Sequence, residues 1–236
     1  MKMAQEYRQH VFKPPEGAAD LLLIRHGESQ AAVDGVPFPL KDGHGDPALH
    51  PNGEDQARAL GHRLKTLPIA AIYVTTLRRT HQTAAPLAAA LQLTPKIEAD
   101  LREIYLGDWD SGLYRKKVAE GDPLFLKSLQ NHEWGEIPNA EATEALHSRV
   151  RAGLMRIARA HPDQLVAVFV HGGVISAAMS IATGAKPFAF LGAANGSISR
   201  LVVDGDRMFV RGFNETSHLI YSTVKTTFPR ARRSAT

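Results

Sequence analysis

Two histidines in this chain of 236 residues follow apolar runs in the same way. The run 21–24 leads directly into Arg25 and His26, and the run 165–170 leads into His171 and Gly172. Continuous apolar runs of this length are typical of buried strands in a parallel sheet. The carboxyl ends of such strands open onto the crevice where α/β sheets bind ligands. Although a single histidine after a strand is more often structural, we expect these two imidazoles in one crevice.

A third apolar run, residues 69–74, is followed by Arg78 and Arg79 in the first turn of a predicted helix. Guanidinium groups match the geometry of phosphate oxygens, and Gly172 opens another helix whose backbone N–H groups point at the same anion. Arginines would repel a metal cation, and the zinc spacing His-Glu-x-x-His and the Walker pattern are both absent. The pattern therefore favours a phosphate pocket that contains imidazoles and needs no metal.

In such a pocket a neutral imidazole can attack phosphorus, and neighbouring arginines favour the neutral form. A departing alkoxide then needs a proton, for which Glu103 is the candidate donor. The apolar and aromatic residues around Glu103 predict partial burial, which favours the proton-carrying form of a carboxyl group. The alternatives are that Glu103 is a surface carboxylate, or that Asp100 or Asp108 is the acid.

The elements that must position these residues alternate along the chain. We predict strands at 20–25, 69–74, 96–98 and 165–170, helices at 51–65, 77–91, 141–160 and 174–183, and a hairpin over 197–213. Thr75 and Thr76 are expected to cap the second helix, and Pro86 to kink or restart it. This order predicts the α/β class, as a three-layer α/β/α sandwich with a mostly parallel sheet and an antiparallel edge strand near the C-terminus.

Two long connections lack periodicity and would supply the wall of the pocket. Residues 30–50 read as a loop, and residues 101–140 as mostly loop with short helical pieces. Trp109, Phe125 and Trp134 have two interpretations, as a surface that stacks on an organic leaving group or as local core. The pocket wall therefore leaves the identity of the substrate open.

Composition limits the class of protein. With no cysteine the chain forms no disulfide and uses no thiolate, which fits a reducing compartment, and we expect a cytoplasmic location. No segment predicts a signal peptide or a membrane span. Much of the net charge of +4 lies in the tail, which we interpret as a solvated end and not as a nucleic-acid site. We divide the chain into an arm (1–19), one catalytic domain (20–220) and a basic tail (221–236).

Four motifs, in this order along the chain, resemble those of the histidine phosphatase superfamily, which is also called the phosphoglycerate-mutase-like superfamily. They are Arg25-His26-Gly27-Glu28-Ser29, residues 75–84, Leu101-x-Glu103 followed by Gly107-x-Trp109-x-x-Gly112, and His171-Gly172-Gly173-Val174-Ile175. Residues 46–57 also resemble a family segment. The resemblance implies that His26 is phosphorylated, that Glu103 is the acid, and that Arg25, Arg79 and His171 bind phosphate. Alignment of residues 75–84 on the family pattern makes Arg79, and not Arg78, the ligand.

One departure concerns the phosphate pocket. Family members often carry an asparagine that touches phosphate at the position of Ala32, where Gln30 or the long loop would have to substitute. The residues around Glu103 and His171 resemble the phosphatase branch more than the mutases. We therefore expect a metal-independent, acid-phosphatase-like hydrolase of small-molecule phosphomonoesters that needs no cofactor. A phosphoglycerate mutase and a catalytically impaired phosphate-binding member are the alternatives, and a homodimer is expected by analogy with the family.

Overall fold

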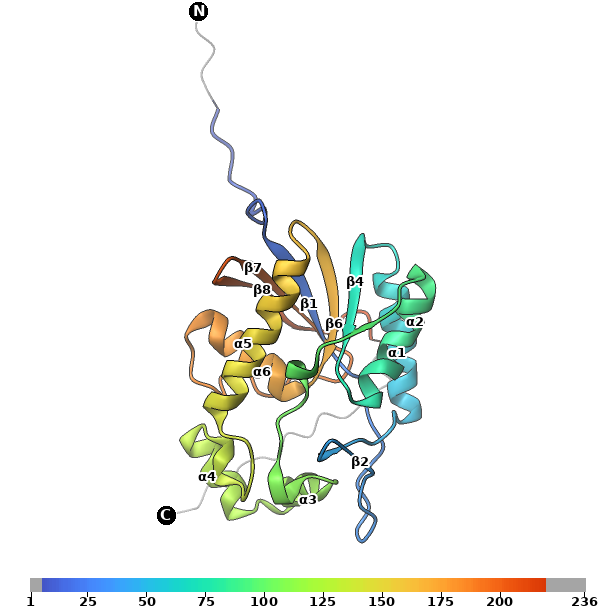
Figure 1. The fold of residues 1–236 in the computed structure, drawn as a ribbon, viewed down its shortest axis with the longest axis vertical. Coiled ribbons are helices and arrows are strands. Elements are labelled where there is room, and N and C mark those ends of the chain that lie inside the picture. Colours follow the sequence, from blue (N-terminus) through green and yellow to red (C-terminus); the bar gives the residue numbers. More distant parts are fainter. Residues whose placement is uncertain (1–5, 220–236) are drawn as a thin grey trace, which may run out of the picture.

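The computed structural model describes residues 6–219, which form a six-stranded sheet in the order β5-β4-β6-β1-β7-β8 (Figure 1). The strands are β1 (Ala19–Arg25), β4 (Ile69–Val74), β5 (Lys96–Ile97), β6 (Leu165–Val170), β7 (Ile198–Asp204) and β8 (Arg207–Glu215). Strands β5, β4, β6 and β1 pair in parallel, whereas β7 runs antiparallel to β1 and β8 antiparallel to β7. The predicted mostly parallel sheet with an antiparallel edge is confirmed.

Helices cover both faces of the sheet. Helices α1 (Pro51–Leu64) and α2 (Arg78–Leu91) lie on one side, and α5 (Thr143–Ala160) and α6 (Gly172–Thr183) on the other (Figure 1). The connections add α3 (Leu113–Glu120), α4 (Pro123–Asn131), three short 3₁₀ turns at Ala99–Leu101, Gly107–Trp109 and Trp134–Glu136, and a small hairpin of β2 (Leu40–Lys41) and β3 (His44–Gly45). The chain is thus the three-layer α/β/α sandwich that the sequence predicts.

Strand β1 shows why its apolar run is continuous. Leu21 and Leu23 pack into the core beneath α5 and α6, while Leu22 and Ile24 pack into the core beneath α1 and α2. Successive side chains of a strand point to opposite faces, so a sheet covered on both faces needs apolar residues at every position. Both cores therefore hold β1 rigidly at the point where Arg25 and His26 leave it.

Helix α2 differs from the prediction at Pro86. The predicted restart does not occur, because the helix runs on to Leu91, and a kink at Pro86 stays a prediction. The backbone carbonyl that Pro86 leaves without an N–H partner belongs to Gln82, an exposed residue. The ring also packs on Gly61 of α1, where a Cβ atom, if glycine had one, would lie 2.9 Å from the Cβ of Pro86. Packing on α1 and the exposed position of Gln82 together make this proline tolerable inside the helix.

The predicted threonine cap of α2 is wrong. Helix α2 begins at Arg78, and its N-cap residue Leu77 makes no side-chain cap hydrogen bond. The Oγ1 atom of Thr75 instead lies 3.0 Å from Nε2 of His171. Helix α6 starts at Gly172, two residues earlier than predicted, so that His171 itself is its N-cap residue. Both differences arise because these strand ends belong to a polar site.

The carboxyl ends of β4, β6 and β1 lie next to one another in the sheet. Helices α3 and α4 and the β2–β3 hairpin all lie beyond this edge (Figure 1). No helix among residues 6–219 is long and apolar enough to cross a membrane. The basic tail at 221–236 lies outside the described residues, and the division into arm, domain and tail stays a prediction.

Candidate active site

His26 and His171 meet at the ends of β1 and β6. Their ring centroids are 5.2 Å apart and their planes are inclined by 61°. The neighbouring strand residues Arg25 and Val170 are direct partners in the parallel pairing of β1 with β6. His26 is 5% exposed and His171 is fully buried. The structure therefore brings together the two imidazoles that the strand ends predicted.

The hydrogen bonds of His26 fix which nitrogen is free to react. Its Nδ1 atom lies 2.7 Å from the carbonyl oxygen of Gly27, an acceptor, so Nδ1 carries the proton. Arg79 donates from Nε to Nε2 of His26 at 3.3 Å, which requires a lone pair on Nε2. His26 is thus a neutral imidazole whose lone pair faces a guanidinium group.

Arg79 and Arg25 are held mainly by backbone carbonyls. Arg79 donates to the Gly45 carbonyl at 2.9 Å, and Arg25 to the Ala193 carbonyl at 2.5 Å. Arg78, by contrast, is exposed and bonds to Asp46 outside the site. The Nε atom of Arg25 is buried without a partner among the described residues, as is Nδ1 of His171. Buried polar atoms without partners are costly, which indicates that a ligand completes them.

Gly172 opens helix α6 beside Arg25. A Cβ atom at Gly172 would lie 3.4 Å from Nε of Arg25, so the backbone and the guanidinium group approach closely. His171, Gly172, Arg25 and Arg79 therefore converge on one spot next to His26. Such a set of donors at a helix N-terminus suits a phosphate dianion.

Glu103 reaches the same spot from the loop after β5. Its Oε1 atom accepts backbone hydrogen bonds from Ile104 at 3.0 Å and from Gly173 at 3.1 Å. A Cβ atom at Gly173 would lie 2.6 Å from Oε1, so a larger residue at this position would displace the Glu103 carboxylate. The rival acids point elsewhere: Asp100 pairs with Arg156, and the exposed Asp108 bonds to Asn139. Neither aspartate lines the cleft, whereas Glu103 does.

Burial and neighbouring cations act together on the buried groups of the site. Burial, followed by the charges of Arg79 and Arg25, lowers the pKa of His26 well below 6.5. Burial, followed by Arg79 and His26, does the same to the pKa of His171. Burial also lowers the pKa of Arg79 to about 10, and the charge of Glu103 has the largest opposing effect on this pKa. Both imidazoles are therefore neutral at neutral pH.

These shifts predict how stability depends on pH. Because both histidines titrate lower in the folded chain than near 6.5, where an unfolded histidine titrates, their neutral forms favour folding above that pH. The stabilisation falls as pH drops from about 6.5 toward the lowered values. We expect the melting temperature of His171→Gln to fall less steeply between about pH 6.5 and 5 than that of the native chain. Equal slopes in scanning calorimetry would contradict this, and His62→Gln, on the exposed side of α1, is the control.

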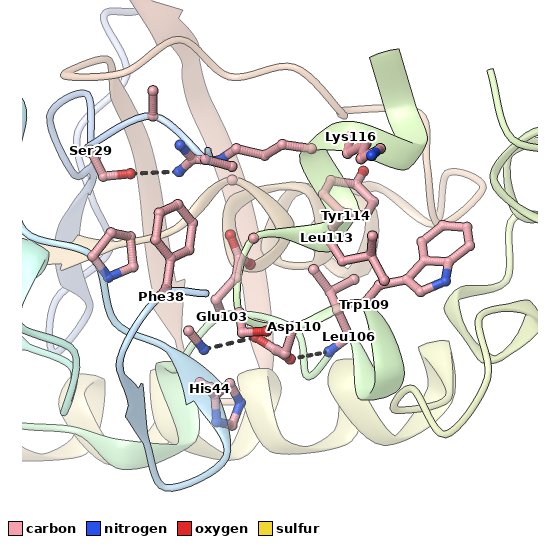
Figure 2. Close-up of a pocket in the computed structure, with 18 of the residues that line it drawn as sticks. Ser29, Phe38, His44, Glu103, Leu106, Trp109, Asp110, Leu113, Tyr114 and Lys116 are labelled. Atoms are coloured by element: carbon pink, nitrogen blue, oxygen red, sulfur yellow. Dashed lines mark hydrogen bonds between the residues drawn. The ribbon is translucent and has the colours of Figure 1, made fainter. Parts of the chain in front are cut away.

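A cleft of about 970 Å³ extends from this spot. Figure 2 shows Phe38, Leu113 and Tyr114 around it, with Glu103 between them. Trp109 and Trp134 line the cleft but are at most 5% exposed, and Phe125 packs on Tyr114 outside the lining. Trp109, Phe125 and Trp134 thus serve mainly as core.

The sequence offered no signal for several residues of the cleft. Asn195 donates to the carbonyl of His26 at 3.0 Å. Asp110 accepts from the backbone N–H groups of Gly45 and Leu106, each at 2.8 Å (Figure 2). The carbonyl of Gly45 also accepts a hydrogen bond from Arg79. Asp110 therefore connects the segment that binds Arg79 with the loop that carries Glu103. The contacts of Asn195 with His26 and of Asp110 with Gly45 join segments far apart in sequence, so no local pattern could reveal them.

Ala32 lines the cleft, and Gln30 does not. The backbone carbonyl of Gln30 accepts a hydrogen bond from Arg115 at 2.6 Å. Gln30 therefore does not substitute for a side chain at Ala32. Among residues 6–219 no three histidine or carboxylate side chains gather closely enough to hold a metal ion.

Comparisons with known proteins agree with this geometry. A model of the histidine phosphatase superfamily (branch 1) matches residues 21–216. Adenosylcobalamin/alpha-ribazole phosphatase of Escherichia coli (strain K12) is 30% identical over 156 residues, which make up 66% of this chain and 75% of that protein. Phosphoserine phosphatase 1 of Hydrogenobacter thermophilus is 29% identical over 202 residues, covering 84% of this chain and 93% of that protein.

Solved structures share the fold. Bacillus stearothermophilus YhfR superposes with a TM-score of 0.73 at 25% identity, over 85% of this chain and 98% of that one. A phosphoglycerate mutase from Bacillus anthracis superposes with a TM-score of 0.70 at 21% identity, over 86% of this chain and 96% of that one. At that identity the second likeness shows the fold alone.

Proposed function

The chain belongs to the histidine phosphatase superfamily, and we propose that it hydrolyses small-molecule phosphomonoesters through a phosphohistidine formed on His26. The observation that carries this proposal is the lone pair on Nε2 of His26, which faces Arg79 in a pocket that also holds Glu103. The family that the motifs predicted is confirmed by the match over residues 21–216. The individual substrate is the open part of the proposal.

In the first step the phosphoryl group docks on Arg25, Arg79, His171 and the backbone N–H groups of α6. Nε2 of His26 forms a bond to phosphorus while the bond from phosphorus to the ester oxygen breaks. Glu103 gives its proton to that oxygen, which leaves as an alcohol. Because the transition state is loose, the guanidinium groups act mainly by positioning and by stabilising charge.

In the second step water attacks the phosphohistidine. Glu103, now a carboxylate, takes the proton of this water, and the bond between Nε2 and phosphorus breaks. Inorganic phosphate leaves, and His26 returns to its neutral form with Nδ1–H still bonded to the Gly27 carbonyl. Each group therefore ends in the state in which it began.

Hydrolysis of an aryl phosphate in the presence of a metal chelator tests the proposal. We expect release of inorganic phosphate from 4-nitrophenyl phosphate and from at least one member of a panel of phosphoglycerates and sugar phosphates. Binding of phosphate without any release would instead identify an impaired phosphate-binding member. Interconversion of phosphoglycerates faster than phosphate release would identify a mutase. The cytoplasmic location and the homodimer stay predictions that these assays do not address.

A further inference from the structure

Arg115 brings a third guanidinium group to the cleft, from the first turn of α3. It donates to the carbonyl of Gln30 at 2.6 Å and to Oγ of Ser29 at 2.7 Å, the latter drawn as the dashed line at Ser29 in Figure 2. Ser29 lies only a few residues beyond His26. A guanidinium group has further N–H donors beyond those that these bonds use. Arg115 is therefore held beside residues 26–30, which we call the nucleophile loop, and it has N–H donors that these two bonds do not use.

The positive charge of Arg115 lacks a carboxylate partner among residues 6–219. Both of its hydrogen bonds go to uncharged oxygens. The next residue, Lys116, also lines the cleft but pairs with Asp34 at 3.1 Å and with Glu120 at 3.9 Å. Glu28, whose charge raises the pKa of Arg115, bonds to Asn52. Of the two neighbouring cations, Arg115 is thus the one available to an anion.

The charge of Arg115 acts on the phosphate end of the cleft. Besides partial burial, the charge of Arg25 lowers the pKa of Arg115. Arg115 in turn lowers the pKa of His26 and of Arg79, after stronger effects of burial and of other groups. These cations repel one another, and an anion between them would relieve that repulsion. The electrostatics and the hydrogen-bond geometry therefore both favour an anion at this place.

The small side chain of Ala32 explains how the start of α3 can lie so near the loop that follows His26. A Cβ atom at Gly112, the N-cap residue of α3, would lie 3.3 Å from Cβ of Ala32 and 3.2 Å from the ring of Phe38. The guanidinium group of Arg115 lies over that ring, 5.1 Å from its centroid. The small side chain at position 32 therefore lets the start of α3 pack on the nucleophile loop.

We propose that Arg115 is a third arginine of the phosphate pocket and binds the dianionic phosphoryl group of the substrate, in place of the side-chain contact that Ala32 does not make. This inference rests on the proposed phosphatase function of the same cleft. Arg115 is then a binding residue from a helix that the sequence did not connect with the nucleophile. Its partner is the transferred group itself and not the leaving group.

Three variants test this assignment: Arg115→Gln, Arg115→Lys and, as the matched control on the same helix, Lys116→Gln. Glutamine can keep an N–H bond to the Gln30 carbonyl but removes the charge, and lysine keeps the charge but not the planar fork. We expect Arg115→Gln to weaken inhibition by inorganic phosphate about 10- to 100-fold, the range for a charged hydrogen bond. Arg115→Lys should lose less, and Lys116→Gln less than about twofold.

Comparing two esters with different leaving groups distinguishes a contact of Arg115 with the phosphoryl group from a contact with the rest of the substrate. With Arg115→Gln, kcat/KM should fall by the same factor for 4-nitrophenyl phosphate and for 4-carboxyphenyl phosphate. A loss confined to the carboxylated ester, with phosphate inhibition unchanged, would overturn the proposal and assign Arg115 to the leaving group. Unchanged kinetics would also overturn it, since Arg115 would then only tether the loop.

Calorimetric titration of inorganic phosphate keeps the test independent of turnover. If the native chain hydrolyses no ester, the proposed function fails, while weaker phosphate binding by Arg115→Gln would still support the role of Arg115. Should Arg115→Gln fold poorly by circular dichroism, Arg115→Met removes the charge in its place, and Arg115→Lys, which preserves the charge, is compared with it. Phosphate binding by Arg115→Lys as weak as that of the folded neutral variant would contradict a role for the charge.

Discussion

Replacing His26 by alanine is expected to abolish turnover and to remove all covalent label from the protein. The reason is that Nε2 of His26 carries the lone pair that would attack phosphorus. This lone pair faces Arg79, and the Nδ1–H group donates to the Gly27 carbonyl. Loss of an enzyme nucleophile typically costs on the order of 10⁴- to 10⁶-fold in kcat. The measurement is release of phosphate from an aryl ester, with His62→Ala on the exposed side of α1 as the control.

Acid-labile, base-stable label is the second readout for His26. A short incubation with a ³²P-labelled ester, stopped by denaturation in base, should leave label on the peptide that contains His26. Label in an acid-stable ester, or on His171 in place of His26, would contradict the proposed covalent step. Because His171 is fully buried with Nε2 against Thr75, we expect no label there.

The fold was predictable where burial imposes a pattern. Strands β4 and β6 have the predicted bounds, since strands covered on both faces are apolar at each position. The convergence of His26, Arg79 and His171 followed because parallel strands end at one edge of the sheet. The resemblance to a known family then chose Arg79 over Arg78, and the structure places Arg79 beside His26.

The rest of the site depends on contacts that no local pattern encodes. Asp110 and Arg115 lie in a connection without periodicity, and each acts on a segment at least 65 residues away in sequence. Thr75 has the chemistry of a helix cap, yet its hydroxyl group lies against His171. Helix propensity predicts that Thr75 caps the helix that follows it. Tertiary packing instead places its hydroxyl group beside His171.

Replacing Glu103 by glutamine separates the two roles that we propose for this side chain. Glutamine keeps an Oε1 acceptor for the N–H groups of Ile104 and Gly173 but carries no acidic proton. In the first step a poor leaving group needs that proton, whereas 4-nitrophenolate leaves readily without it. We expect kcat/KM to fall about 10²- to 10⁴-fold for an alkyl phosphate and much less for 4-nitrophenyl phosphate.

Because the same carboxylate activates water in the second step, the two steps of Glu103→Gln should separate in time. With 4-nitrophenyl phosphate we expect a burst of nitrophenol of about one equivalent per site, followed by slow turnover, and phosphate bound to His26. Asp108→Asn, which alters a rival acid outside the cleft, should behave as the native chain does. Equal losses of kcat/KM for both esters, without a burst, would show that Glu103 only positions the loop through Gly173. A burst together with a leaving-group-dependent loss requires one group that gives a proton in the first step and takes one in the second.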